Sequence, residues 1–236
     1  MLMFDPQMNV TPFKKPAAKT PSGYKVVARG TDAAEIYIYG VIGGDWFGEG
    51  ITAKQVADDL KKLGKVSSID VRINSEGGNV FDGKAIYSLL VENKATVNVK
   101  IDGLAASAAS FIAMAGNTIE IAEGAFVMIH DAYGVSFGRA EDMRKYADLL
   151  DTVNATIYDV YAGRTKQPLD KIKKWMKDET WMTAKEAVTN GFADTITENL
   201  KVAASIAHPD RFKHLPSALL PKRAAAAAQL AALKRL

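Results

Sequence analysis

Strand-like and helix-like segments alternate through the first half of this chain, and this alternation constrains its fold more than any other feature. The predicted elements are strands at 35–43, 67–75 and 95–101 and helices at 53–63 and 80–93. Short joints connect them. Because strands joined by helices pair in parallel through right-handed crossovers, the sequence predicts an α/β fold with a mostly parallel sheet. Functional sites in such sheets gather beyond the carboxyl ends of the strands.

The second half continues with short strands and a long helix. We predict strands at 118–122 and 126–130, a helix at 139–162 closed by Gly163, and a helix at 169–179. Capping boxes are predicted at Thr52 with Gln55 and at Thr183 with Glu186. Together these elements predict one domain at 31–200, preceded by an irregular arm at 1–30 and followed by a basic, alanine-rich tail at 201–236.

Composition excludes several classes of function. The chain has 236 residues, 48% of them hydrophobic, so it can bury a sizeable core. Its net charge of +3 comes from basic and acidic residues that are interleaved outside the tail, which argues against a nucleic-acid surface. The absence of cysteine excludes disulfides, thiolate metal sites and cysteine nucleophiles. We expect no metal and no other cofactor.

The apolar segments are too short for a membrane protein. No window approaches the roughly 18 uninterrupted apolar residues of a membrane span. The opening MLMFDPQMNVTPFKK lacks the charge and apolar run of a signal peptide. We therefore expect a soluble protein of a reducing, cytoplasmic compartment.

The joint after the second strand, INSEGGNVFDG (73–83), contains paired glycines ahead of a helix. Such a turn lets backbone amides point at an anion or a developing oxyanion, helped by the helix N-terminus. Paired glycines also simply make turns, so the local pattern leaves both readings open.

The stretch GLAASAASFIAMAG (103–116) raises the same choice for Ser107 and Ser110. A serine at the head of a helix that follows a strand presents its hydroxyl as a nucleophile elbow does, although the G-x-S-x-G pattern is missing. Serine among alanines in a buried helix is otherwise a small packing residue. Locally the two serines are equivalent.

His130 is the histidine candidate for a general base. It ends the apolar segment FVMIH, whereas His208 and His214 lie in the polar tail. A triad also needs a carboxylate to orient the imidazole, and Asp178 and Glu179 are candidates at a helix-to-turn junction. A structural histidine and a solvated acidic pair are the plainer alternatives.

In their order along the chain, these segments resemble the ClpP family of self-compartmentalised serine peptidases (family S14). The resemblance rests on INSEGGNVFDG, GLAASAASFIAMAG, FVMIHDAYG, the long helix and DETWMTAKEAVTNGFAD, and it covers about residues 35–198. The wording ETWMTA and the short interval between serine and histidine are most similar to bacteriophage and prophage head-maturation proteases of this family. The expected fold is a ClpP/crotonase-like arrangement of repeated β-β-α and βαβ units with a protruding handle helix.

The resemblance implies a role for each matching residue. Ser107 is implied as nucleophile, His130 as general base, the amides of Gly78 and Ala108 as oxyanion hole, and Glu179 as third triad member where housekeeping relatives have aspartate. Asp178, next to it, stays an alternative. An extended protein or peptide substrate is expected along Gly77, Asn79, Val80 and Phe81 and the segment after His130. Ser110 keeps a packing role.

The family also implies partners and leaves competing functions. We expect a stacked-ring homo-oligomer, with a Clp-type ATPase unfoldase or a capsid or scaffold protein as further partners, in the host cytoplasm if the chain is phage-encoded. The alternatives are a crotonase-type acyl-CoA enzyme, a catalytically weak assembly scaffold, and a Ser-Lys peptidase related to signal-peptide peptidases. Ser107 with His130 favours the peptidase over the first and the last.

Overall fold

A single eight-stranded sheet organises the chain, and the computed structural model describes residues 23–44, 50–198, 206 and 209–219. The strands are β1 (Tyr24–Arg29), β2 (Ala33–Ile42), β3 (Ser68–Gly78), β4 (Thr96–Ala106), β5 (Thr118–Ala122), β6 (Phe126–Ile129), β7 (Thr180–Thr183) and β8 (Thr195–Thr197). The main path runs β1-β2-β3-β4-β5-β8, parallel except for β1, while β6 pairs parallel with the end of β4 and antiparallel with β7. The predicted α/β fold with a mostly parallel sheet is confirmed.

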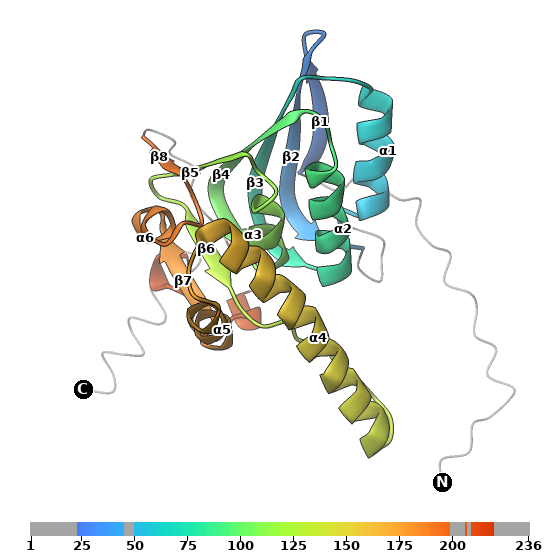
Figure 1. Cartoon of the computed structure of the whole chain (residues 1–236), viewed down its shortest axis with the longest axis vertical. Coiled ribbons are helices and arrows are strands. Elements are labelled where there is room, and N and C mark those ends of the chain that lie inside the picture. The colour runs from blue at the N-terminus through green and yellow to red at the C-terminus, as the bar shows by residue number, and fades with distance from the viewer. Residues whose placement is uncertain (1–22, 45–49, 199–205, 207–208, 220–236) are drawn as a thin grey trace, which may run out of the picture.

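Helices cover the apolar face of this sheet (Figure 1). Those over its central strands are α1 (Ala53–Leu63), α2 (Val80–Val91) and α3 (Ala108–Ala113), and the later helices are α4 (Ala140–Thr165), α5 (Leu169–Lys177) and α6 (Ala184–Asn190). Alternate residues of β3, Ile69, Val71 and Ile73, are fully buried against Ile86 of α2 and Ile112 of α3 in one core cluster. This burial follows the two-residue period that the sequence shows.

The long helix α4 is the predicted handle. Its C-terminal half packs on the domain through Val153, Ile157 and Tyr161, whereas its N-terminal half extends away from the sheet (Figure 1). The predicted stop at Gly163 is wrong, because the helix continues to Thr165 and ends at Lys166, which adopts a left-handed conformation with φ 60°. None of the helices in the described part of the chain has the length and apolar character needed to cross a membrane.

Several predicted boundaries differ from the structure. Residues 24–29, expected within an irregular arm, form β1 because Tyr24 is buried and the segment pairs along β2. β4 runs five residues beyond the predicted end at 101, since its last residues pair with β6. Strands β7 and β8 were not predicted. The capping boxes at Thr52 and Thr183 are confirmed. The arm before residue 23 and the alanine-rich stretch after 219 lie outside the described residues.

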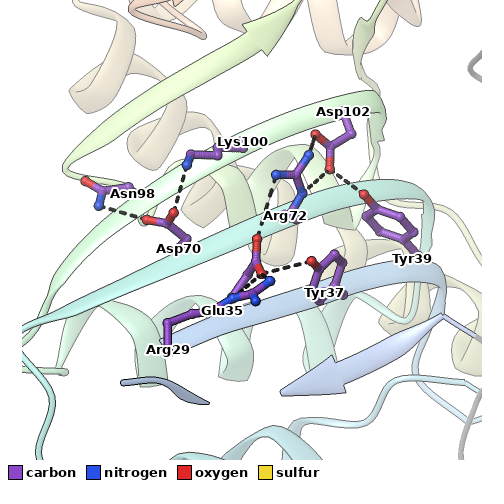
Figure 2. A network of polar contacts seen from close by, with 9 residues as sticks. All are labelled: Arg29, Glu35, Tyr37, Tyr39, Asp70, Arg72, Asn98, Lys100 and Asp102. Carbon is purple, nitrogen blue, oxygen red and sulfur yellow. Dashed lines mark hydrogen bonds and ion pairs between the residues drawn. The ribbon is translucent and has the colours of Figure 1, made fainter. Parts of the chain in front are cut away.

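The opposite face of the sheet carries a network of polar contacts, shown in Figure 2. Its members are Arg29, Glu35, Tyr37, Tyr39, Asp70, Arg72, Asn98, Lys100 and Asp102. Asp102 is fully buried; it accepts hydrogen bonds from Arg72 Nε at 2.9 Å and from the Tyr39 hydroxyl. Because Asp102 lies in β4, five residues before Ser107, these contacts tie the strand that leads into Ser107 to its neighbour β3 and, beyond it, to β2.

Candidate active site

Ser107 stands at the sharp turn between β4 and α3. Its backbone has φ 54° and ψ −125°, a sparsely populated conformation that costs on the order of 1–3 kcal/mol and persists only where the surrounding structure imposes it. The Ser107 amide donates a hydrogen bond to Met128 O at 2.9 Å, which holds the turn against β6. The strand-to-helix turn therefore presents the Ser107 hydroxyl in the manner of a nucleophile elbow.

The structure brings His130 to Ser107. His130 directly follows β6, whose parallel pairing with the end of β4 places the two residues side by side. Ser107 Oγ and His130 Nε2 lie 2.8 Å apart, a hydrogen-bond distance. An imidazole at this distance can accept the serine proton.

Burial is the main reason that the pKa of His130 falls below its ordinary value. The positive charge of Lys213 acts in the same direction, whereas the negative charges of Glu179 and Asp131 act to raise the pKa. The balance keeps the imidazole neutral near pH 7. A neutral imidazole is the form that a general base requires.

Glu179, rather than Asp178, is the buried carboxylate beside His130. The antiparallel register of β6 and β7 pairs Ile129 with Thr180, so one step further brings His130 opposite Glu179. Glu179 is 7% exposed, whereas Asp178 forms an exposed ion pair with Lys174. Within the described residues, no hydrogen bond joins the Glu179 carboxylate to His130 itself.

The environment of Glu179 favours its charged form. Burial acts to raise the pKa of Glu179, but hydrogen bonds from the amides of Lys213 and His214 and from the Trp181 indole outweigh it. The nearby His130 lowers the pKa further, and the net result lies below the ordinary value for glutamate. Glu179 is therefore an anion close enough to His130 for the two charges to interact. Its backbone is also left-handed, with φ 49°.

The paired glycines lie against the Ser107 turn. An alanine methyl at Gly77 would stand 2.6 Å from Ala106 O and 2.8 Å from Ser107 Cβ, so this close approach requires glycine. Gly77 has φ 89° and Gly78 has φ 148°. Gly78 and Ala108, the predicted oxyanion-hole residues, both line the cavity that Ser107 and His130 line.

A cavity of about 350 Å³ opens beside the serine and histidine. Its lining includes Glu76, Gly78, Asn79, Val80, Phe81, Ser107, Ala108, Phe111, His130, Ala132, Tyr133, Tyr146, Leu149, Leu150, Val153, Ile157, Tyr161, Arg211 and Phe212. Of the predicted substrate residues, Asn79, Val80 and Phe81 are among them, while Gly77 lies behind the turn. Much of the lining is apolar and comes from α4, so the cavity suits an apolar side chain.

Two residues of the site escaped the sequence analysis. Ser110 was predicted only to pack, yet its buried hydroxyl donates to Ser107 O at 2.6 Å and lies 2.8 Å from the Tyr161 hydroxyl. Tyr161 is buried in α4, and burial raises its pKa. These contacts connect the Ser107 turn to the handle helix. The spacing from Ser107 to Ser110, one helical turn, was the available signal.

The C-terminal segment also reaches the site, which the sequence did not indicate. Arg211 and Phe212 line the cavity, and Lys213 and His214 bind Glu179 through their amides. The described part of the chain contains no group of three or more histidine or acidic residues that could hold a metal ion.

Comparison with known proteins gives a consistent set of similarities. The family model described as Clp protease matches residues 22–200. The ATP-dependent Clp protease proteolytic subunit from Pleurastrum terricola is 36% identical over 130 residues, which are 53% of this chain and 65% of that protein. ATP-dependent Clp protease proteolytic subunit 1 from Synechococcus sp. (strain CC9902) is 35% identical over 138 residues, 56% of this chain and 68% of that protein.

Solved structures give the same similarity. A ClpP1 point mutant from Listeria monocytogenes matches with a TM-score of 0.61 at 27% identity, over 72% of this chain and 92% of that one. The match to the Pleurastrum subunit spans just under two thirds of that protein's length.

Proposed function

Because the chain belongs to the Clp protease family, we propose that it is a serine peptidase that cleaves peptide bonds inside an oligomeric chamber. The observation that carries the proposal is the 2.8 Å contact between Ser107 Oγ and His130 Nε2 at a cavity that Gly78 and Ala108 also line. Nucleophile, base and oxyanion donors are thereby within reach of one carbonyl group.

In the proposed reaction, Ser107 Oγ attacks the peptide carbonyl carbon while His130 Nε2 takes the hydroxyl proton. The carbonyl oxygen becomes an oxyanion that the Gly78 and Ala108 amides stabilise, and losing one such donor typically costs about 3 kcal/mol of barrier. His130 then gives its proton to the leaving amine, which leaves an acyl ester on Ser107. Water, deprotonated by His130, releases the acid and restores Ser107.

Glu179 is the proposed third member of the triad. Its low pKa keeps it charged beside His130, where it stabilises the imidazolium that forms in each half-reaction. Glutamate in place of aspartate adds one methylene, and the left-handed backbone at Glu179 together with three hydrogen-bond donors fixes where the longer side chain points. Glutamate serves this role in other serine hydrolases.

The proposed chamber is a stacked-ring homo-oligomer built through the handle. Large apolar side chains are exposed on α4 and the loop before it, namely Tyr133, Val135, Phe137, Met143 and Leu149. Such a concentration is typical of a surface that a second copy covers. The relatives are named ATP-dependent Clp protease proteolytic subunits, which supports a Clp-type ATPase as a further partner.

A finer proposal concerns the biological setting. The ETWMTA segment and the 23-residue interval between Ser107 and His130 resemble bacteriophage head-maturation proteases. On this proposal the substrate is a capsid or scaffold protein in the host cytoplasm. Cleavage of such a protein without an added ATPase separates this setting from general degradation, in which a folded substrate needs the unfoldase.

One observation favours an inactive scaffold as second candidate: within the part of the chain that the structure describes, Glu179 makes no hydrogen bond to His130. An acyl-CoA enzyme of the crotonase type would not need the contact between Ser107 and His130, and failure to bind CoA is expected.

Hydrolysis of casein and of short fluorogenic peptides tests the proposal. We expect turnover by the unmodified protein and its loss in Ser107→Ala, whereas Ser88→Ala, a change at an exposed serine of α2, keeps full activity. Native mass spectrometry of the same preparations reports the number of subunits. Turnover that survives Ser107→Ala, or none in an assembled oligomer, contradicts the proposal.

A further inference from the structure

A C-terminal segment beyond the family match, described at residues 206 and 209–219, packs on the domain through a small hydrophobic cluster of its own. Ile206 and Leu219 are each 3% exposed and belong to a cluster with Leu104, Ala106 and Met128. The family model ends at residue 200, so this segment is additional to it. Figure 1 draws it in red beside β7. Buried anchors at both ends make the segment part of the folded domain rather than a loose tail.

Between Ile206 and Leu219, two backbone amides of this segment donate hydrogen bonds to the Glu179 carboxylate. The amide of Lys213 donates to Oε2 at 3.0 Å and the amide of His214 donates to Oε1 at 2.7 Å. Trp181 Nε1 donates to Oε1 at 3.2 Å, so two of the three donors come from the segment. Without them the nearly buried carboxylate would lose most of its hydrogen bonds.

The same segment forms one side of the cavity. Arg211 and Phe212 line it together with Ser107 and His130. The Phe212 ring packs edge-on against Trp181 with 5.3 Å between ring centroids. This contact fixes Phe212 on the strand that begins immediately after Glu179. Carboxylate and cavity wall are thus held by one continuous stretch of chain.

We propose that residues 209–215 are a built-in part of the active site, whose Lys213 and His214 amides position the Glu179 carboxylate beside His130. This inference rests on the proposed peptidase function. The opposite role would be inhibition, in which the segment blocks access to Ser107. However, a cavity of about 350 Å³ lies beside Ser107, and Ile206 and Leu219 are buried in the domain. On this proposal the segment supports catalysis instead of blocking it.

Proline at 214 tests the proposal, because it removes one amide donor from Glu179. We expect His214→Pro to lower kcat about tenfold with KM nearly unchanged, since a hydrogen bond to a charged group is worth about that factor. Ser217→Pro, a proline at an exposed position of the same segment, is the control and is expected to keep the activity of the unmodified protein. Circular dichroism checks that each variant is folded.

A double-mutant cycle shows whether the change acts through Glu179. Urea unfolding is measured for the unmodified protein, His214→Pro, Glu179→Ala and the double variant. The loss in unfolding midpoint caused by His214→Pro is expected to shrink once Glu179 is alanine. Leu219→Ala, which loosens the anchor, replaces His214→Pro in the same cycle should the proline variant not fold.

Equal midpoint losses in both backgrounds overturn the proposal, because the proline then acts without Glu179. Higher turnover in His214→Pro or Leu219→Ala overturns it as well, since that result identifies an inhibitory role. The unfolding cycle needs no turnover. If the unmodified protein cleaves no peptide, the peptidase function fails, while the cycle still decides whether the segment holds Glu179.

Discussion

Replacing Gly77 by alanine is expected to lower kcat/KM about a hundredfold, because the added methyl group has no room behind the Ser107 turn. The methyl carbon would lie 2.6 Å from Ala106 O, 2.8 Å from Ser107 Cβ and 2.9 Å from Ala108 N. Two of these atoms are backbone, so the strain is relieved only by moving the turn itself. A displacement approaching 1 Å at a reacting group costs about 10²-fold.

The same change carries a stability cost that can be worked from two sources. Alanine at φ 89° costs roughly 1–2 kcal/mol from backbone strain, and overpacking adds about 1–3 kcal/mol. We expect Gly77→Ala to lower the free energy of unfolding by about 2–5 kcal/mol. Urea unfolding measures this cost, and peptide hydrolysis below saturation measures kcat/KM.

Two matched glycines separate the causes. Gly64 has φ 73° but open space around it, so Gly64→Ala carries the backbone strain without the clash. Gly124 has open space and no positive φ, so Gly124→Ala carries neither. Both controls are expected to keep full activity. Activity of Gly77→Ala within threefold of the unmodified protein would refute the reasoning that this turn fixes the nucleophile.

Two further predictions follow from the charges. Asp102→Ala leaves the half-buried Arg72 without its main partner and is expected to cost about 3 kcal/mol of unfolding free energy. Asp70→Ala removes a more exposed ion pair and is expected to cost under about 1 kcal/mol. Urea unfolding measures both losses, and equal losses contradict the prediction. Lys213→Met removes a positive charge that lowers the pKa of His130, so that pKa rises and the acid limb of kcat/KM moves to higher pH. The shift is expected to shrink in 1 M salt, and no shift at low salt contradicts it.

The sequence predicts the elements whose signal is local. The helices after Thr52 and Thr183 carry their own caps, and the strands at the centre of the sheet carry a run of β-branched residues. By contrast β7 and β8 are three or four residues long and exist only through pairing with β6 and β5. Their partners lie more than fifty residues away, so no local pattern marks them.

The residues of the candidate site also fall into those that the sequence marks and those that it does not. The motif order pointed to Ser107 and His130, and the structure places them in hydrogen-bond contact. The role of Lys213 and His214 could not be predicted, because they bind Glu179 through their backbone amides. Almost every residue type has such an amide, so the sequence does not mark these two positions. Ser110 was assigned to packing because its hydrogen bonds run to the carbonyl of Ser107 and to Tyr161, fifty-one residues further along.

Covalent labelling by a fluorophosphonate tests the central claim, that Ser107 is a nucleophile activated by His130. Mass spectrometry of the assembled protein is predicted to show one adduct per subunit, on Ser107, and His130→Ala is predicted to slow its formation greatly. The account is contradicted if the oligomer takes up no label under conditions that label a known serine peptidase, or if the label lies on another residue.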